Sequence, residues 1–295
     1  MLSINEFQNY LEYDKDVIFL PDEFFINEVI HGFDLETTFL ENFNPKITKK
    51  DMMSRGETPF CRAYMNVSVY IRGNDPVPLG VICLVDTSED TPLRYETDEE
   101  ISERIWNMVN DITKFQKVNP ETVKKLVNFS EKTYNEMVKN EHDIIHQLID
   151  EMGEPVKFPV IVIRVKSECD FYRVFARMQY NIQPHVMIGH NSNGFDMAFI
   201  LRRLEFLGGD MMEEFYRIST GKSMSYGEMF KYKVIRNENI TISQGEDSVE
   251  FVYFKFDGTL FWDSMTIFQR DCPDKQSNLN YMLDTLEIPS KVGLS

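Results

Sequence analysis

Apolar residues follow two different periods along this chain. They alternate with polar residues, or form β-branched runs, in the first part of the sequence, and strands are expected there over 28–37, 63–71 and 77–86. The last two are separated by Gly-Asn-Asp-Pro, which predicts a hairpin. Between about 97 and 152 apolar residues recur every three or four positions, which predicts a helical insert whose second helix reaches Leu148.

Strands and helices alternate in the middle of the chain. A strand over 158–165 leads into a helix capped by Ser167, and a buried strand at Val186–Gly189 leads into a helix that opens near Phe195. Beyond Gly221, turn signals separate short strands near 232–236, 240–243, 249–254 and 259–263, before a helix over 278–286. We therefore expect an α/β fold with a mixed central sheet, a helical insert and a β-hairpin-rich C-terminal part. Residues 1–27 are expected to be an N-terminal extension to a domain over 28–295.

The composition is that of a folded protein, with 42% hydrophobic residues in 295. Apolar runs are too short to cross a membrane and the first residues are acidic, so an intracellular protein without a secretory signal is expected. The four cysteines are isolated, which argues against a zinc site or a disulfide framework. The formal charge of −17 argues against a protein that coats nucleic acid nonspecifically, but it is compatible with carboxylates that bind divalent metals.

Two carboxylates occupy alternate positions of the first predicted strand. Asp34 and Glu36 share one face, while Phe33 and Leu35 share the other. Two neighbouring carboxylates repel each other unless a cation lies between them, and Mg²⁺ or Mn²⁺ prefers such oxygen ligands. The alternative is a pair of solvated surface charges.

A third acid opens a helix after a polar loop. Asp196 follows the strand Val186–Gly189, and its structural explanation is the favourable field at a helix N-terminus. Phe195 and Phe199 are expected to flank this acid, away from the buried stripe of the helix. Aromatic rings beside a metal-binding acid suit single-stranded nucleic acid, whose bases stack on such rings.

Together these segments resemble the exonuclease region of family B DNA polymerases. Asp34-Leu-Glu-Thr37 resembles the first exonuclease motif, and Pro184 through Phe199 resembles the second. Further similarity, in the order of the family, is found at Ser167-Glu168, Arg202-Arg203, Phe261-Trp-Asp263 and Gln276-Ser-Asn-Leu279-Asn-Tyr-Met-Leu. The resemblance covers about residues 29–291.

The resemblance implies a ribonuclease-H-like (DnaQ-like) proofreading domain that removes nucleotides from single-stranded 3′ ends during DNA replication. With two Mg²⁺ or Mn²⁺ ions, Asp34 would be the shared ligand, Glu36 a ligand that orients the attacking water, and Asp196 a ligand of the second ion. The positions that match those holding the single-stranded DNA end are Thr37, Asn191, Phe195, Phe199 and Leu279.

The third motif of the family, Y-x-x-x-D, has no match in the expected place. Tyr281 and Asp284 have the wrong spacing, and His146 to Asp150 precedes the second motif and is expected to be helical. We therefore expect the N-terminal portion of a longer polymerase or a split reading frame. It is expected to be inactive or weak as an isolated enzyme and to be partnered by the remainder of a polymerase chain. The alternatives are a catalytically incomplete module that only binds single-stranded DNA or a polymerase, and an acidic interaction protein.

Two further polar residues have open roles. Asp263 ends a predicted strand. It could either support the proposed metal ligands without binding metal itself or serve as a cap or turn residue. His190 is expected to be polar loop surface, with a phosphate contact as the alternative.

Overall fold

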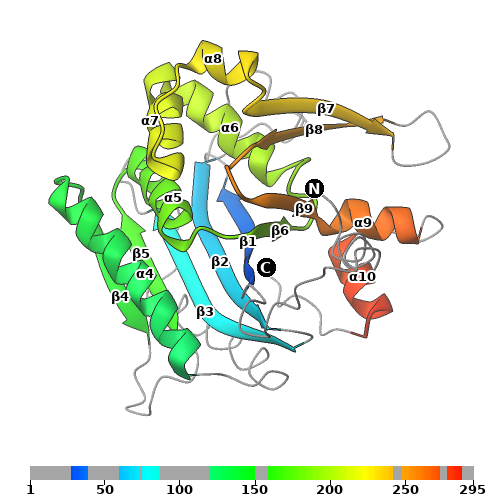
Figure 1. Cartoon of the computed structure of the whole chain (residues 1–295), viewed down its shortest axis with the longest axis horizontal. Coiled ribbons are helices and arrows are strands. Elements are labelled where there is room, and N and C mark those ends of the chain that lie inside the picture. Colours follow the sequence, from blue (N-terminus) through cyan, green and yellow to red (C-terminus); the bar gives the residue numbers. More distant parts are fainter. Residues whose placement is uncertain are drawn as a thin grey trace, which may run out of the picture.

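The computed structural model describes residues 28–38, 60–72, 75–86, 120–149, 159–241, 248–272 and 278–287. A mixed sheet lies at its centre (Figure 1) and contains β1 (Glu28–Thr38), β2 (Phe60–Arg72), β3 (Asp75–Asp86), β4 (Ile144–Ile149), β5 (Val160–Val165), β6 (Val186–Gly189) and β9 (Leu260–Asp263). The strand order is β4-β5-β3-β2-β1-β6-β9. Three neighbouring pairs are parallel, namely β3–β5, β1–β6 and β6–β9, and the others are antiparallel.

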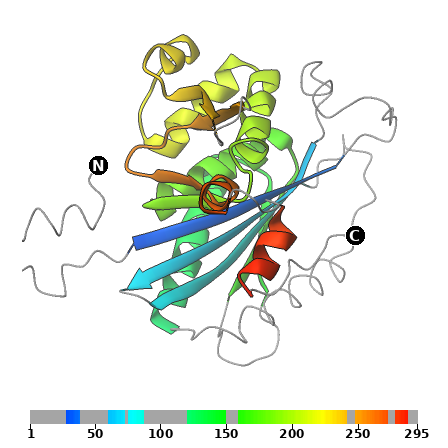
Figure 2. The same cartoon turned by 90° about the vertical axis from the view of Figure 1, so that its right-hand side faces the viewer.

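The first three strands confirm the pattern read from the sequence. β1, β2 and β3 form an antiparallel meander, visible in Figure 2 as three long neighbouring strands. On β1, Val29, Phe33 and Leu35 are buried in the main hydrophobic core, whereas Asp34 is half-buried between the last two. The alternation therefore separates a core face from a polar face, because successive strand side chains point to opposite sides.

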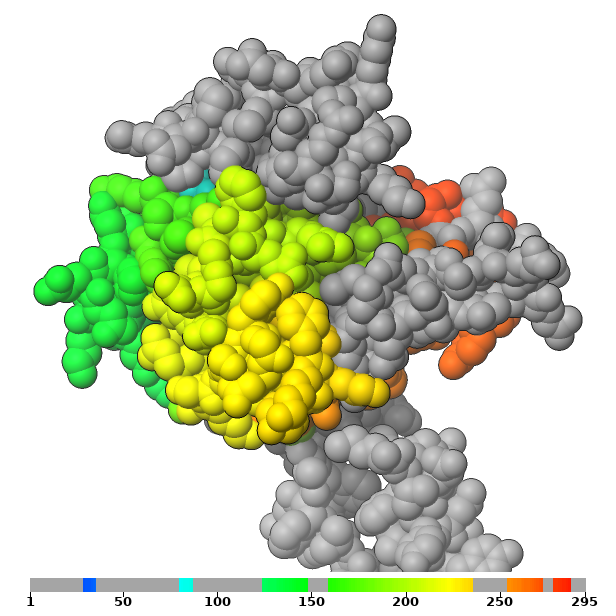
Figure 3. Space-filling model, turned by 90° about the horizontal axis from the view of Figure 1, so that it is seen from above, coloured from blue at the N-terminus to red at the C-terminus, as the bar shows by residue number. Residues whose placement is uncertain are grey.

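Helices cover the core face of the sheet. α4 (Pro120–Lys139) and α5 (Glu168–Ile182) contact its strands, and α6 (Asp196–Leu207), α7 (Gly209–Thr220) and α8 (Tyr226–Lys231) extend this helical layer. α5 contacts β3, α4 and α7, and α7 contacts α6 and α8. Figure 3 shows this layer from above as a continuous surface that runs from green to yellow. Its centre is aromatic: Phe171 and Phe175 of α5 and Phe215 of α7 are fully buried.

The helix expected to reach Leu148 is shorter, and this prediction was wrong. α4 ends at Lys139, the chain turns through Glu141 with a φ of 62°, and residues 144–149 form β4. The expectation that His146 to Asp150 is helical was therefore also wrong for the strand residues. β4 pairs antiparallel with β5, with Ile144 6% exposed and Ile145 48% exposed, so a two-residue period suits this sheet edge better than a helical one. The predicted first helix of the insert and the N-terminal extension lie outside the described residues.

The C-terminal part contains a separate hairpin. β7 (Ile235–Thr241) pairs with β8 (Ser248–Phe254), so the strands expected near 232–236 and 240–243 belong to one strand. α9 (Ser264–Asp271) and α7 were not predicted, whereas α10 (Leu279–Thr285) was. None of the described helices combines the length and apolar character needed to cross a bilayer.

Candidate carboxylate site

The candidate site lies where β1 continues past the end of β6. The two strands pair in parallel from Ile30 opposite Val186 to Gly32 opposite Ile188. Asp34 is two residues beyond Gly32, on the face opposite Phe33 and Leu35. Glu36 follows two residues later in β1, and its backbone pairs with Ala63 of β2. The position of the Glu36 side chain is outside the described atoms.

One hydrogen bond joins the two halves of the site. The Leu35 backbone N–H donates to Oδ1 of Asp196 over 3.1 Å. Leu35 lies between Asp34 and Glu36 in the sequence, and Asp196 is 161 residues from Leu35. The Asp196 side chain, in a residue 3% exposed, therefore lies against the strand segment that carries both other acids.

The loop between β6 and α6 makes this approach possible. A Cβ on Gly189 would lie 2.6 Å from Cβ of Ser192 and 3.2 Å from the Phe33 carbonyl oxygen, so only glycine fits at the end of β6. Asn191 then adopts the left-handed conformation, with a φ of 57°. The Asn191 and Ser192 carbonyls accept hydrogen bonds from Phe195 and Met197 at 2.9 and 2.8 Å, which connects the loop to the first turn of α6.

Asp263 holds this loop from the neighbouring strand. β9 pairs with β6, so that Asp263 is opposite Gly189. The carboxylate, in a residue 5% exposed, accepts hydrogen bonds from the backbone N–H groups of Asn191 (2.9 Å), Asn193 (3.0 Å) and Met265 (3.0 Å). Both roles left open by the sequence are therefore present, because Asp263 caps α9 and also contacts the loop that leads to Asp196.

His190 differs from the expected solvated loop residue. Its Nδ1 lies 3.1 Å from Oγ of Ser264, and its side chain is half-buried. This contact adds a second connection between the loop and the start of α9. No local sequence pattern predicts this contact, since the two residues are 74 positions apart.

The two phenylalanines of α6 differ in exposure. Their ring centroids are 6.2 Å apart and the rings are stacked, but Phe195 is half-buried whereas Phe199 is 1% exposed. The expectation that Phe199 lies away from the buried stripe was wrong. α6 packs against both α7 and β8, so more than one stripe of this helix is covered. Thr37 extends β1 and Leu279 is the half-buried first residue of α10, and their roles in holding DNA stay predictions.

The chemistry of the donors suits a hard divalent cation. Asp34, Glu36 and Asp196 would offer carboxylate oxygens, which Mg²⁺ and Mn²⁺ prefer over nitrogen or sulfur ligands. Among the side chains that the structure describes, which exclude that of Glu36, no three His, Cys, Asp or Glu residues form a metal-binding group. Two of the three proposed metal ligands, Asp34 and Asp196, have described side chains. The third, Glu36, is included because of its position in β1.

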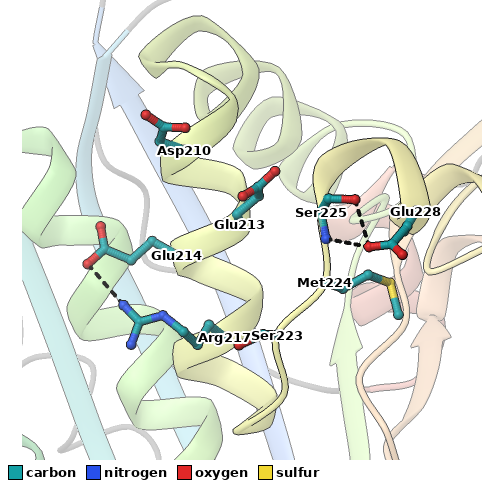
Figure 4. A pocket seen from close by; sticks show the side chains of 8 residues that line it. All are labelled: Asp210, Glu213, Glu214, Arg217, Ser223, Met224, Ser225 and Glu228. Carbon is teal, nitrogen blue, oxygen red and sulfur yellow. Dashed lines mark hydrogen bonds and ion pairs between the residues drawn. The ribbon is translucent and has the colours of Figure 1, made fainter.

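A separate acidic pocket lies between α7 and the segment before α8 (Figure 4). It is lined by Asp210, Glu213, Glu214, Arg217, Ser223, Met224, Ser225 and Glu228. Several of its carboxylates have structural partners: Glu228 bonds to Ser225, Glu213 accepts from the Tyr226 N–H, and Glu214 pairs with Arg173. None of the lining residues belongs to β1, β6, β9 or the loop before α6. This pocket is therefore distinct from the carboxylate site.

Comparison with known proteins points to DNA polymerases. A family model described as DNA polymerase family B, exonuclease domain, matches residues 101–286, a range that contains Asp196 and Asp263 and begins after Asp34 and Glu36. The chain is similar to the DNA polymerase of Phaeocystis pouchetii virus, 26% identical over 130 residues, which are 42% of this chain and 12% of that protein. It is also similar to the DNA polymerase of Pyramimonas orientalis virus, 27% identical over 112 residues, 38% of this chain and 8% of that protein. The matches thus span only a small share of these relatives' length.

Proposed function

Because this chain belongs to DNA polymerase family B, through the exonuclease domain of that family, we propose that it is a 3′–5′ exonuclease region that shortens single-stranded DNA ends during replication. The observation that carries this proposal is the hydrogen bond from the Leu35 N–H to Asp196, because it brings the acids of two distant motifs to one end of the sheet. The strand order β3-β2-β1-β6-β9, with β6 and β9 parallel to β1, supports a ribonuclease-H-like fold. Single-stranded DNA and the rest of a polymerase chain would be its partners, at the site of replication.

In this proposal Asp34, Glu36 and Asp196 hold two Mg²⁺ or Mn²⁺ ions. When bound, such ions stabilise the attacking and the leaving oxygen of an in-line displacement at phosphorus. Glu36 orients the attacking water, and the Leu35 N–H keeps the Asp196 carboxylate in position. Hydrolysis breaks the bond between phosphorus and the 3′ oxygen of the preceding nucleotide, which receives a proton, and releases one nucleotide.

The DNA end would be held by residues beside these acids. We assign the stacking contact to Phe195, whose ring is half-buried, and a supporting role beneath it to Phe199, which is buried. Asn191, in the loop before α6, and Thr37 and Leu279 complete the proposed set. The protein carries a formal charge of −17, so we expect ring stacking and bound metal, rather than broad electrostatic attraction, to supply DNA affinity.

The test is degradation of a 5′-labelled single-stranded oligonucleotide with Mg²⁺ or Mn²⁺. We expect slow stepwise shortening from the 3′ end, because the third motif of the family has no match in this chain. Asp34→Ala and Asp196→Ala should lower that rate by more than about a hundredfold, because loss of a direct ligand exceeds the cost of losing an outer group. Asp143→Ala is the matched control, since Asp143 is an exposed acid paired with Lys166 beside the far edge of the sheet. Binding of the oligonucleotide without any shortening would instead support the catalytically incomplete module.

A further inference from the structure

We propose that Asp263 is a positioning residue, which fixes the loop of residues 190–195 and thereby holds Asp196 against β1. This inference rests on the proposed function, because it concerns how the carboxylate site is kept in its binding geometry. Asp263 itself contacts backbone N–H groups, and we assign it no contact with metal or DNA.

The hydrogen bonds of Asp263 exceed what a helix cap needs. The Met265 N–H, two residues on, is the ordinary partner of a residue that caps α9. The other two bonds go to Asn191 and Asn193, which are 72 and 70 residues away in the sequence. One carboxylate oxygen serves Asn191 and Met265 and the other serves Asn193, so both oxygens are used across two elements.

Burial makes this arrangement specific. Asp263 is 5% exposed, and a carboxylate removed from water is costly unless hydrogen bonds compensate it. The loop turns at Asn191, which has a φ of 57°, a left-handed conformation that asparagine tolerates better than most residues. This turn directs the N–H groups of Asn191 and Asn193 to the Asp263 carboxylate. The acid and the loop amides therefore stabilise each other, and removal of the acid leaves two loop N–H groups without their acceptor.

The loop transmits this constraint directly to Asp196. The carbonyls of Asn191 and Ser192 accept hydrogen bonds from Phe195 and Met197, the residues on either side of Asp196. The carboxylate of Asp196 in turn accepts a hydrogen bond from the Leu35 N–H of β1. Groups behind metal ligands commonly change metal affinity by 10–100-fold when mutated, and Asp263 holds such a ligand through its backbone.

Asp263→Ser separates the capping of α9 from the contacts with the loop. Serine is an equally good helix cap, but its single hydroxyl cannot replace both loop contacts. We expect hydrogen exchange of the amides in 190–196 to accelerate at least tenfold, while exchange of the α9 amides stays unchanged. We also expect Mn²⁺ binding, measured by calorimetry on the whole chain, to weaken about tenfold. Unchanged exchange in 190–196 would overturn the proposal. An equal acceleration throughout α9 would also overturn it, because it would indicate a general destabilisation and not a loss of loop positioning.

Two additional variants keep the outcome clear. If Asp263→Ser does not fold, as judged by circular dichroism, Asp263→Asn provides the same exchange test, because its amide oxygen can still accept from Asn191 and Met265 while its NH₂ group faces the Asn193 N–H. Asp34→Ala tests the site itself. Wild-type Mn²⁺ affinity in Asp34→Ala would contradict the proposed function, whereas the exchange rates in 190–196 judge Asp263 independently of any metal.

Discussion

Buried acids in the helical layer and at the end of β1 are stabilised in different ways. Glu168, at the start of α5, forms an ion pair with the guanidinium of Arg203 on α6, with 2.6 Å between Nε and Oε1 and a second contact through Nη2. Asp196 and Asp263 accept hydrogen bonds from backbone N–H groups at the sheet end. An arginine cancels a full charge, whereas a backbone amide carries none. The backbone contact to Asp196 therefore adds no opposing full charge at a carboxylate whose oxygens a divalent cation prefers as ligands.

The largest effect is expected when the arginine of the buried ion pair in the helical layer is replaced. Arg203→Met leaves Glu168 without its guanidinium, in a pair whose side chains are 2% and 9% exposed. We expect a loss of about 3–5 kcal/mol in the free energy of unfolding, because one buried charge remains uncompensated. Urea unfolding measures it.

The double variant Glu168→Gln/Arg203→Met is the control for that experiment. We expect it to recover much of the lost stability, because no buried charge is left behind. If Arg203→Met lowered the free energy of unfolding by less than about 1 kcal/mol, the Glu168–Arg203 ion pair would contribute little to stability.

A second variant removes charge at the sheet end and keeps the hydrogen bond. In Asp196→Asn the amide oxygen can still accept the Leu35 N–H. Without metal we expect the free energy of unfolding to stay within about 1 kcal/mol of wild type. At a Mn²⁺ concentration of 100 times Kd, wild type should gain about 2.7 kcal/mol, and the variant should lose most of that gain. Equal stabilisation of both by Mn²⁺, read from thermal unfolding, would contradict a ligand role for Asp196.

The sequence predicted individual strands and helix starts better than the contacts between residues that are far apart in the chain. Alternation placed Asp34 opposite Phe33 and Leu35, and the glycine-containing loop after β6 marked the start of α6. The helical spacing before Leu148 was misleading, because pairing with β5 favours a strand at residues 144–149. The burial of Phe199 depends on α7 and β8, and the bonds of Asp263 cross 70 or more residues. Local patterns do not contain such contacts.

A third variant tests an uncharged partner at the start of α5. Oγ of Ser167 accepts the Asp170 N–H at 3.0 Å, next to the Glu168–Arg203 pair. Ser167→Ala should lower the free energy of unfolding by about 1 kcal/mol, because one helix N–H loses its acceptor. Ser223→Ala, at an exposed position, should change it by less than about 0.5 kcal/mol in the same urea titration. Equal effects of the two would exclude a specific capping contribution.

The smallest effect is expected at β4, where a titratable group is stabilised in its neutral form. Burial lowers the pKa of His146 below its ordinary 6.5, and its Nε2 lies 2.7 Å from Oγ of Ser130. A lowered pKa means that the unfolded chain binds the proton more readily. Stability from this group is thus complete above pH 6.5 and is lost as the pH falls from 6.5 through the lowered value.

Urea midpoints at pH 7.5 and 5.5 would measure this contribution. Wild type should lose more stability between the two than His146→Gln, because the variant has no imidazole to protonate. The same loss in both proteins would exclude His146 as a source of the pH dependence.

The Leu35 N–H lies beyond the last residue of β1 that pairs with β6, so Asp196 replaces a neighbouring strand as its acceptor. Loss of the acceptor at position 196 should cost about 1–3 kcal/mol even in a relative without the proposed hydrolysis. Neutral substitution at position 196 should therefore favour asparagine over alanine. Among related proteins, an acid at position 34 is consequently better evidence of the proposed hydrolysis than a polar residue at position 196.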